Sequence, residues 1–318
     1  MASAGSRHIG WWRRCVWALP SAALWCVGKL PFWVLWGLSD LLCLLVRDVV
    51  RYRRGLVAAN IAASFPELTI DEQKDIARRF YRHLTDYFVE TLKFATMSER
   101  AIRRRMTFAD TQLIDRTLAS GRNIVIYTSH FGNWEWITSM SLWCRTSAMG
   151  PGRKPLIDPE AEFAHIYRPL KSGFFDRFFL RLRSRFNVSV PMHGAFRQLL
   201  TWRRQNVPWI CGFLSDQKPS HNGATFKVPF LGRETPFIGG TEELAQKLDA
   251  VVMMFDTSVR GRGRYHSVIR LLTDDPRSLP PGEITRRYAY NLEEQIRRTP
   301  QAYLWSHNRW RLPKNNFK

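Results

Sequence analysis

The chain has 318 residues, 45% of them hydrophobic, which is enough to bury a core in one large domain or two smaller ones. No segment has a disordered or low-complexity composition, and no repeat of the solenoid or propeller type is present. The formal net charge is +21, from 48 Lys and Arg against 27 Asp and Glu, so the surface should attract an anionic partner.

The aromatic residues narrow the choice of partner, and the spacing of the cysteines bears on disulfides and metal sites. The chain has 13 Trp and 20 Phe, and aromatic side chains beside basic ones are typical of a membrane interface. No RNP motif, zinc finger or basic region with heptads is present, so we do not expect nucleic acid as the partner. None of the five cysteines forms a CxxC pair, and neither a disulfide framework nor a metal site is predicted: Cys15, Cys26, Cys43, Cys144 and Cys211.

The first element is a long apolar stretch over residues 15–46. It exceeds the roughly 20 residues that span a bilayer, and it is too long for the core of a signal peptide. Lys29 and Asp40 interrupt it, and Pro20 and Pro31 should kink it. We expect one tilted, kinked membrane span. The alternatives are a re-entrant or interfacial helical pair and, less favoured, a soluble buried hairpin.

Basic residues flank this stretch on both sides. Because positive charge favours the cytoplasmic side, the C-terminal flank is expected to face the cytoplasm. The predicted organisation is an N-terminal membrane anchor over residues 1–54 and a second domain over residues 55–318. The flanking arginines are Arg7, Arg13 and Arg14 before the stretch, and Arg47, Arg51, Arg53 and Arg54 after it.

A long amphipathic helix is predicted next, ending near residue 94. Thr69 and Glu72 have the spacing of a capping box, which marks a helix start. Apolar residues then recur at helical spacing: Phe80, Leu84, Tyr87, Phe88 and Leu92.

From residue 122 onward, predicted strands alternate with predicted helices. This order indicates an α/β fold with a mostly parallel central sheet flanked by helices. In such sheets the active site lies at the carboxyl ends of the strands. The strands are expected at 123–129, 164–170, 207–215, 250–259 and 265–272, and the helices at 134–144, 241–248 (with a capping box starting at Thr241) and 284–298.

A further helix is expected over residues 174–186. Its phenylalanines and leucine lie along one stripe, and its arginines fall largely elsewhere. Such a basic amphipathic helix can lie in the headgroup layer of a membrane. An ordinary helix packed on the sheet has the same pattern, so both interpretations stay open.

The stretch "YTSHFGNWEW", residues 127–136, contains the candidate chemistry. Glu135 lies five positions after His130, which places the two side chains about 140° apart on a continuous helix. The pair is compatible only with a histidine that ends the strand, a turn at Gly132, and an acid in the first turn of the next helix with Asn133 as its N-cap. Glu135 would then orient the imidazole of His130 as a base.

Spacing alone does not decide whether His130 and Glu135 are catalytic, since a histidine at a strand end followed by an acid is common. No GxSxG nucleophile, HExxH motif or phosphate loop is present. The chemistry we expect is therefore a direct transfer without a covalent enzyme intermediate.

Several segments resemble one known family. "SHFGNWEW" looks like the H-x4-D/E motif of glycerolipid acyltransferases, and more specifically that of the lipid A biosynthesis acyltransferases. The similarity extends from about Leu30 to the end of the chain, in the same order as in the family. It includes "RRGLVAANIAASFPELT", "YRPLKS", "SDQKPSHNGATFKVPFLGRETPFIGGTEELAQKL" and "YLWSHNRWR".

The resemblance implies transfer of a fatty acyl chain from an acyl carrier protein thioester to a hydroxyl of a lipid A precursor. His130 would be the base and Glu135 its partner. No cofactor is expected, and acyl-CoA is the less favoured donor. The implied partners are acyl carrier protein, an anionic lipid and the bacterial inner membrane, with the catalytic domain on its cytoplasmic face. The expected substrate-binding or oxyanion residues are Arg168, Asp216, Asn133 and Arg233.

Three other functions remain as alternatives. The first is an acyltransferase with the same fold that acts on a lysophospholipid or an aminolipid. The second is a non-catalytic scaffold on a membrane surface, against which the His130 and Glu135 pair argues. The third is binding of nucleic acid through charge alone, which predicts a steep dependence on salt. Trp305, His307 and Arg309 of the last block are interpreted as structural or interfacial.

Overall fold

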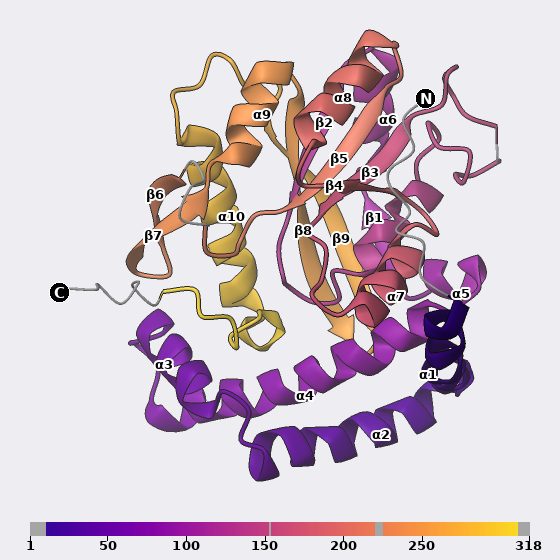
Figure 1. Cartoon of the computed structure of the whole chain (residues 1–318). Coiled ribbons are helices and arrows are strands. Elements are labelled where there is room, and N and C mark those ends of the chain that lie inside the picture. Colours follow the sequence, from indigo (N-terminus) through magenta and orange to yellow (C-terminus); the bar gives the residue numbers. More distant parts are fainter. Residues whose placement is uncertain (1–10, 153, 220–224, 311–318) are drawn as a thin grey trace.

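The computed structural model describes residues 11–152, 154–219 and 225–310, with side chains from residue 18 onward (Figure 1). Its centre is a seven-stranded sheet in the order β1-β9-β8-β2-β5-β3-β4. All neighbouring strands are parallel except β8 and β9, which form an antiparallel hairpin. The strands are β1 (Met106–Ala109), β2 (Ile124–Thr128), β3 (Glu162–Tyr167), β4 (Val188–Pro191), β5 (Trp209–Leu214), β8 (Val251–Gly261) and β9 (Arg264–Thr273).

Helices cover both faces of this sheet, and the predicted α/β class is confirmed. Alternate residues of β2 enter two separate hydrophobic clusters, with Val125 and Tyr127 in one and Ile124 and Ile126 in the other. β2 is therefore buried on both faces, as the apolar run in its sequence indicates. The helices are α1 (Trp11–Lys29), α2 (Phe32–Leu44), η1 (Leu45–Val49), α3 (Arg54–Ser64), α4 (Ile70–Phe94), α5 (Glu99–Arg103), α6 (Thr111–Ala119), η2 (Trp136–Leu142), α7 (Gly173–Arg183), α8 (Ala195–Arg204), α9 (Gly240–Leu248), α10 (Glu283–Arg298) and η3 (Pro300–Ala302).

A small antiparallel hairpin lies beside α10, outside the main sheet. Its strands are β6 (Thr225–Phe230) and β7 (Arg233–Ile238). The sequence did not predict this hairpin, nor β1, β4, α6 and α8. These elements are short, and only some of their residues are buried, so their periodicity is weak.

The α-helix expected over residues 134–144 is instead the 3-10 helix η2. Thr138 Oγ1 donates to the carbonyl of Glu135, and Ser139 Oγ donates to the carbonyl of Trp136, both at 2.6 Å. Hydroxyls that bond a carbonyl three residues back compete with the α-helical pattern. All but one of the residues from Trp136 to Leu142 are buried, so tertiary packing sets the conformation of this segment.

Of the two capping boxes expected, the first is confirmed and the second is wrong. The amide of Glu72 donates to Thr69 Oγ1 at 3.3 Å, and the amide of Thr69 donates to Glu72 Oε2 at 2.8 Å. α9 has Gly239 as its N-cap, without a side-chain cap. Glu242 accepts instead from the amides of Gly282 and Thr285, so it caps α10.

No single described helix is long and apolar enough to cross a bilayer. Ala18–Lys29 and Phe32–Val49 meet the length and composition test only as a pair, bent by 115° at Pro31. The single kinked span expected from the sequence is thus a sharply broken pair. Arg7 and the rest of residues 1–10 lie outside the described residues. The predicted division into residues 1–54 and 55–318 stays a prediction.

α2 runs alongside α4, and its inner side is buried there (Figure 1). Leu35 and Ser39 are fully buried, and Cys43 is nearly so. α1 also approaches α4 closely, because a Cβ on Gly28 would lie only 2.6 Å from the carbonyl oxygen of Leu92. The N-terminal helices are therefore packed against the α/β fold rather than joined to it by an extended linker.

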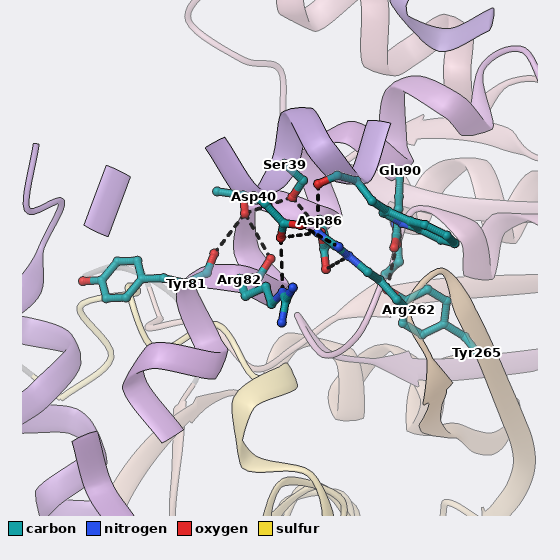
Figure 2. A network of polar contacts seen from close by, with 11 residues as sticks. Ser39, Asp40, Tyr81, Arg82, Asp86, Glu90, Arg262 and Tyr265 are labelled. Atoms are coloured by element: carbon teal, nitrogen blue, oxygen red, sulfur yellow. Dashed lines mark hydrogen bonds and ion pairs between the residues drawn. The ribbon is translucent and has the colours of Figure 1, made fainter. Parts of the chain in front are cut away.

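An ion-pair network fixes α2 to α4 and to the β8–β9 hairpin (Figure 2). Arg262, at the hairpin tip, donates from Nη2 to Asp40 Oδ1 at 2.8 Å and to Asp86 Oδ1 at 2.6 Å. Ser39 Oγ donates to Asp86 Oδ1 at 2.6 Å. The tip also comes close to Glu90, because a Cβ on Gly263 would lie 3.3 Å from its Oε1. We call Asp40, Asp86 and Arg262 the hairpin clamp.

Candidate active site

His130 and Asp216 lie at the carboxyl ends of two neighbouring parallel strands. β2 ends at Thr128 and β5 ends at Leu214, and these two residues are partners in the sheet. His130 and Asp216 each follow two residues later, so the register of the sheet brings them together. His130 Nδ1 is 2.7 Å from Asp216 Oδ1, and the His130 amide donates to Asp216 Oδ2 at 2.9 Å.

These two contacts define the tautomer of His130. An ionised carboxylate only accepts hydrogen bonds, so Nδ1 carries the hydrogen and Nε2 is left as the basic nitrogen. Nε2 lies 3.0 Å from the side-chain nitrogen of Gln217, which donates to it. The imidazole packs edge-on against the indole of Trp134, with ring centroids 5.0 Å apart. These contacts therefore hold the imidazole of His130 in one orientation, with Nε2 as its basic nitrogen.

The ionised state of Asp216 has identifiable causes. Burial by itself would raise the pKa of this carboxyl group. The charge and hydrogen bonds of His130, and then the charge of Arg309, outweigh burial and hold its pKa below the ordinary value.

Glu135 does not hydrogen-bond His130, in contrast to the expectation from the sequence. Its carboxylate is 1% exposed and forms a bidentate pair with Arg183, through Nε at 2.8 Å and Nη2 at 2.6 Å. The Tyr87 hydroxyl lies 3.4 Å from Glu135 Oε1. Gly132 has a φ of 63°, which turns the chain so that His130 and Glu135 face different partners. The acid that orients the histidine is Asp216.

One face of α4 holds the loop between His130 and η2. His83 Nε2 is 3.3 Å from the carbonyl oxygen of Gly132, and Tyr87 stacks on Trp134 with centroids 4.0 Å apart. Glu90 Oε2 accepts from Asn133 Nδ2 at 3.1 Å. Positions 83, 87 and 90 fall on one side of a helix, so a single rigid element positions the whole loop.

Glu90 is a fully buried carboxyl group beneath this loop. Burial raises its pKa to about 7, although hydrogen bonds from Tyr265 and Asn133 act in the opposite direction. The Tyr265 hydroxyl donates to Glu90 Oε2 at 2.7 Å. Asn133 thus hydrogen-bonds Glu90 through its side chain. The N-cap of η2 is Glu135, not Asn133 as the sequence suggested.

The block "YLWSHNRWR" packs against the other side of the same loop. The amide of Leu304 donates to the His130 carbonyl at 3.1 Å, and the Gly132 amide donates to the carbonyl of Ala302 at 2.9 Å. Trp305 is fully buried. Arg309 is 1% exposed and lies over the ring of Phe237 at 4.5 Å, and its guanidinium has no hydrogen-bond partner among the residues that the structure describes. The described residues of the block thus support the loop of His130, and Arg309 also acts electrostatically on Asp216.

An apolar cavity of about 60 Å³ lies between the sheet and η2. Glu135, Arg183 and Trp134 line it together with residues from the four strands β2, β3, β5 and β8. The apolar lining includes Ile126, Ile137, Met140, Phe163, Ile166, Ile210, Leu214 and Phe255.

The remaining predicted site residues lie in two different places. Arg168 directly follows β3 and is exposed at the carboxyl edge of the sheet, the edge that holds His130. Arg233 donates to Ser64 Oγ at 2.6 Å and lies 3.8 Å over the ring of Trp310, so it joins β7 to α3. The described contacts of Arg233 do not connect it to His130.

Four residues of the site were not predicted from the sequence: Gln217, Arg183, Glu90 and Tyr87. Gln217 directly follows Asp216, and its place after a strand end was the available signal. Arg183, Glu90 and Tyr87 lie on amphipathic helices, where nothing in the sequence distinguishes them from other polar or core residues. Only the tertiary fold brings them to the loop.

Comparison with known proteins connects this geometry to a family. The profile of the family described as "Bacterial lipid A biosynthesis acyltransferase" matches residues 4–312. The chain is 23% identical over 291 residues to "Lipid A biosynthesis palmitoleoyltransferase" of Escherichia coli (strain K12), covering 91% of this chain and 88% of that protein. It is also 23% identical over 293 residues to "Lipid A biosynthesis lauroyltransferase" of the same organism, covering 91% and 89%.

Proposed function

Since the chain belongs to the bacterial lipid A biosynthesis acyltransferase family and is thus an acyltransferase, we propose that it transfers a fatty acyl chain from an acyl carrier protein thioester to a hydroxyl of a lipid A precursor. The observation that carries the mechanism is the hydrogen bond of 2.7 Å between His130 Nδ1 and Asp216. It leaves Nε2 as a base at the edge of the sheet where α/β folds place their chemistry.

In the proposed reaction, the acceptor hydroxyl takes the place of the Gln217 amide at His130 Nε2. The imidazole removes the hydroxyl proton as the oxygen attacks the thioester carbonyl carbon. The tetrahedral intermediate then collapses, the carbon–sulfur bond breaks, and the imidazolium returns the proton to the leaving thiolate. Asp216 stabilises the imidazolium throughout. The products are an ester and the free thiol of the carrier.

Glu135 has a different role in this mechanism from the one its motif suggests. Its pairing with Arg183 supports a positioning role, in which the pair closes one end of the loop that carries His130. The apolar cavity beside the pair offers a place for part of the acyl chain. Arg168 is proposed to stabilise the oxyanion or to bind a lipid phosphate, because its exposed guanidinium follows a strand at the same edge.

The proposed partners agree with the charge of the chain. Acyl carrier protein and lipid A precursors are both anionic, and a net charge of +21 favours encounter with each. Association with the donor should therefore weaken as salt rises.

We further propose that the protein lies on the cytoplasmic surface of the inner membrane through α2 and η1. Their inner side packs on α4, and their outer side leaves large apolar residues exposed. An exposed apolar row of this size is typical of a membrane-binding surface. We call these residues the apolar face: Trp33 (74% exposed), Leu41 (64%), Leu44 (53%), Val49 (72%) and Val50 (61%).

The direct test incubates the purified full chain with acyl carrier protein thioesters and a lipid A precursor, and identifies the products by mass. We expect a transferred acyl ester, and we expect His130→Ala to reduce its rate at least about a hundredfold. His193→Ala, at an exposed histidine away from β2, is the matched control and should keep the rate. Unchanged transfer by His130→Ala would refute the mechanism. Acyl transfer to a lysophospholipid or an aminolipid, but not to the lipid A precursor, would show that the acceptor is one of those lipids.

A further inference from the structure

A second site lies between the N-terminal helix and α7. The groove there has a volume of about 770 Å³ and is lined by α1, the C-terminal end of α4, and α7. None of His130, Asp216 or Gln217 lines it. The groove is therefore separate from the place where acyl transfer is proposed.

The α7 side of the groove is cationic. Arg177 and Arg181 are four residues apart on α7, so they project from one side of the helix, and Arg185 follows the end of the helix. Arg185 is held in place by hydrogen bonds to the carbonyls of Phe94 at 3.0 Å and Met97 at 2.5 Å. Among the described residues, no carboxylate lines the groove.

Arg177 and Arg181 carry like charges on adjacent turns of α7, and an anion bound between them would offset their repulsion. Like charges at a spacing of four residues destabilise a helix. Arg181 is exposed and has no hydrogen-bond or ion-pair partner in the described part of the chain. A phosphate group matches such a cluster well, because guanidinium groups donate paired hydrogen bonds to its oxygens.

The α1 side of the groove is apolar. Ala18, Ala22 and Trp25 line it, and Phe174 and Phe178 extend the apolar surface onto α7. Trp25 is 56% exposed, and the neighbouring Leu19 is 80% exposed. This wall thus continues the exposed apolar surface of the N-terminal helices. A ligand that satisfies both walls needs a phosphate and a hydrocarbon chain.

We propose that this groove binds a membrane lipid with a phosphate-bearing headgroup. The phosphate lies between Arg177 and Arg181, and the acyl chains lie along Ala22, Trp25 and Phe178. The opposite side of α7 carries Arg183, which pairs with Glu135. A bound lipid therefore joins α1 to the helix that supports the active-site loop.

The test measures lipid binding to the purified full chain in detergent by native mass spectrometry, with no acyl donor present. Phosphatidylglycerol should bind, and diacylglycerol with the same chains should not. The double variant Arg177→Gln/Arg181→Gln should bind phosphatidylglycerol at least about tenfold more weakly, since two charge-assisted contacts are lost. Ala22→Trp should also weaken binding, because it fills the groove without changing the charge.

Two controls separate this site from charge alone and from the transfer reaction. Arg197→Gln/Arg204→Gln removes two exposed arginines from α8 and should bind phosphatidylglycerol like the natural chain. His130→Ala should also bind it normally, whereas its rate of acyl transfer should fall as proposed above. Equal loss in the α8 variant, equal binding of diacylglycerol, or displacement of the lipid by millimolar inorganic phosphate would each overturn the proposal.

Discussion

The side chains on either side of Gly132 contribute to the site through different partners. His130 is bound to Asp216 from β5, whereas Glu135 is bound to Arg183 from α7. Asp216 is 2% exposed and Glu135 is 1% exposed. Each buried carboxylate therefore depends on its partner to compensate its charge. Removing one member of a buried charged pair leaves the other uncompensated.

Asp216→Asn tests the orientation of His130. An amide in this position can donate to Nδ1 and so favours the wrong tautomer. We expect kcat to fall about 10²- to 10⁴-fold with little change in KM, as steady-state kinetics can measure. Asp274→Asn, at an exposed aspartate, should keep full activity. A full rate in Asp216→Asn would show that His130 does not depend on this carboxylate.

Glu90→Gln tests the buried carboxyl group beneath the loop. Its pKa is about 7 in the folded chain against an ordinary value of 4.5, so the unfolded chain releases its proton first as pH rises. Stability therefore falls between about pH 4.5 and pH 7, by on the order of 3 kcal/mol for this group. A glutamine keeps an oxygen that accepts from Tyr265 and Asn133 but cannot ionise.

We expect Glu90→Gln to unfold like the natural chain at pH 5 and at a higher temperature at pH 8, as a thermal melt at each pH can measure. Glu294→Gln, at an exposed glutamate on α10, should follow the natural chain at both pH values. Parallel pH trends in Glu90→Gln and the natural chain would contradict the expectation.

At this scale the sequence singled out His130 and Asp216 but did not predict the contact between them. His130 was singled out by the motif that it shares with the resembled family, and Asp216 by its place at the end of a predicted strand. The partner of His130 was assigned to Glu135, because Glu135 is near in sequence and completes a motif. The contact with Asp216 depends on β2 and β5 being neighbours in register, and a single sequence does not contain that information.

Among the elements, α4 connects the most parts of the molecule. Its 25 residues contact the active-site loop through His83, Tyr87 and Glu90, and they contact the hairpin clamp through Asp86. The sequence predicted this helix well, because its capping box and apolar spacing are strong local signals. It did not predict the cap of α10, since Glu242 comes from another helix.

Arg262→Met tests the hairpin clamp. The change leaves Asp86 buried beside Asp40 with no arginine between them, so we expect a loss of about 2–4 kcal/mol in the free energy of unfolding. Chemical denaturation in detergent measures it. Arg264→Met, at the exposed arginine two residues further on, is the control and should cost less than about 0.5 kcal/mol. Equal stability of the two variants would show that the clamp contributes nothing.

At the scale of the whole molecule, α2, which carries most of the apolar face, packs on α4 (Figure 1), and α4 holds the loop of the candidate active site. The alternation of strands and helices was sufficient to predict the α/β class. The arrangement of residues 18–49 was not predicted, because an apolar run has the same composition whether it spans a bilayer or packs along another helix. The packing of α2 on α4 depends on Ser39 and Asp86, which are distant in sequence.

Trp33→Asp/Val49→Asp tests the apolar face. Both side chains are more than 70% exposed, so the fold should tolerate the change. We expect binding to anionic vesicles to weaken at least about tenfold in a flotation assay, because two apolar groups can no longer enter the lipid. Tyr290→Asp, at a side chain of α10 that is 63% exposed, should bind normally. Equal binding by all three proteins would place the membrane contact elsewhere.

The hairpin clamp has a consequence for which lipids can react. It joins α2 to α4, and α4 holds the loop of His130, so one continuous set of contacts connects His130 to the apolar face. For an enzyme that lies on a bilayer through that face, the height of His130 Nε2 above the lipid is a constant of the molecule. In the proposed reaction, we expect geometry to exclude a hydroxyl that its lipid presents at another depth, whatever its chemical reactivity.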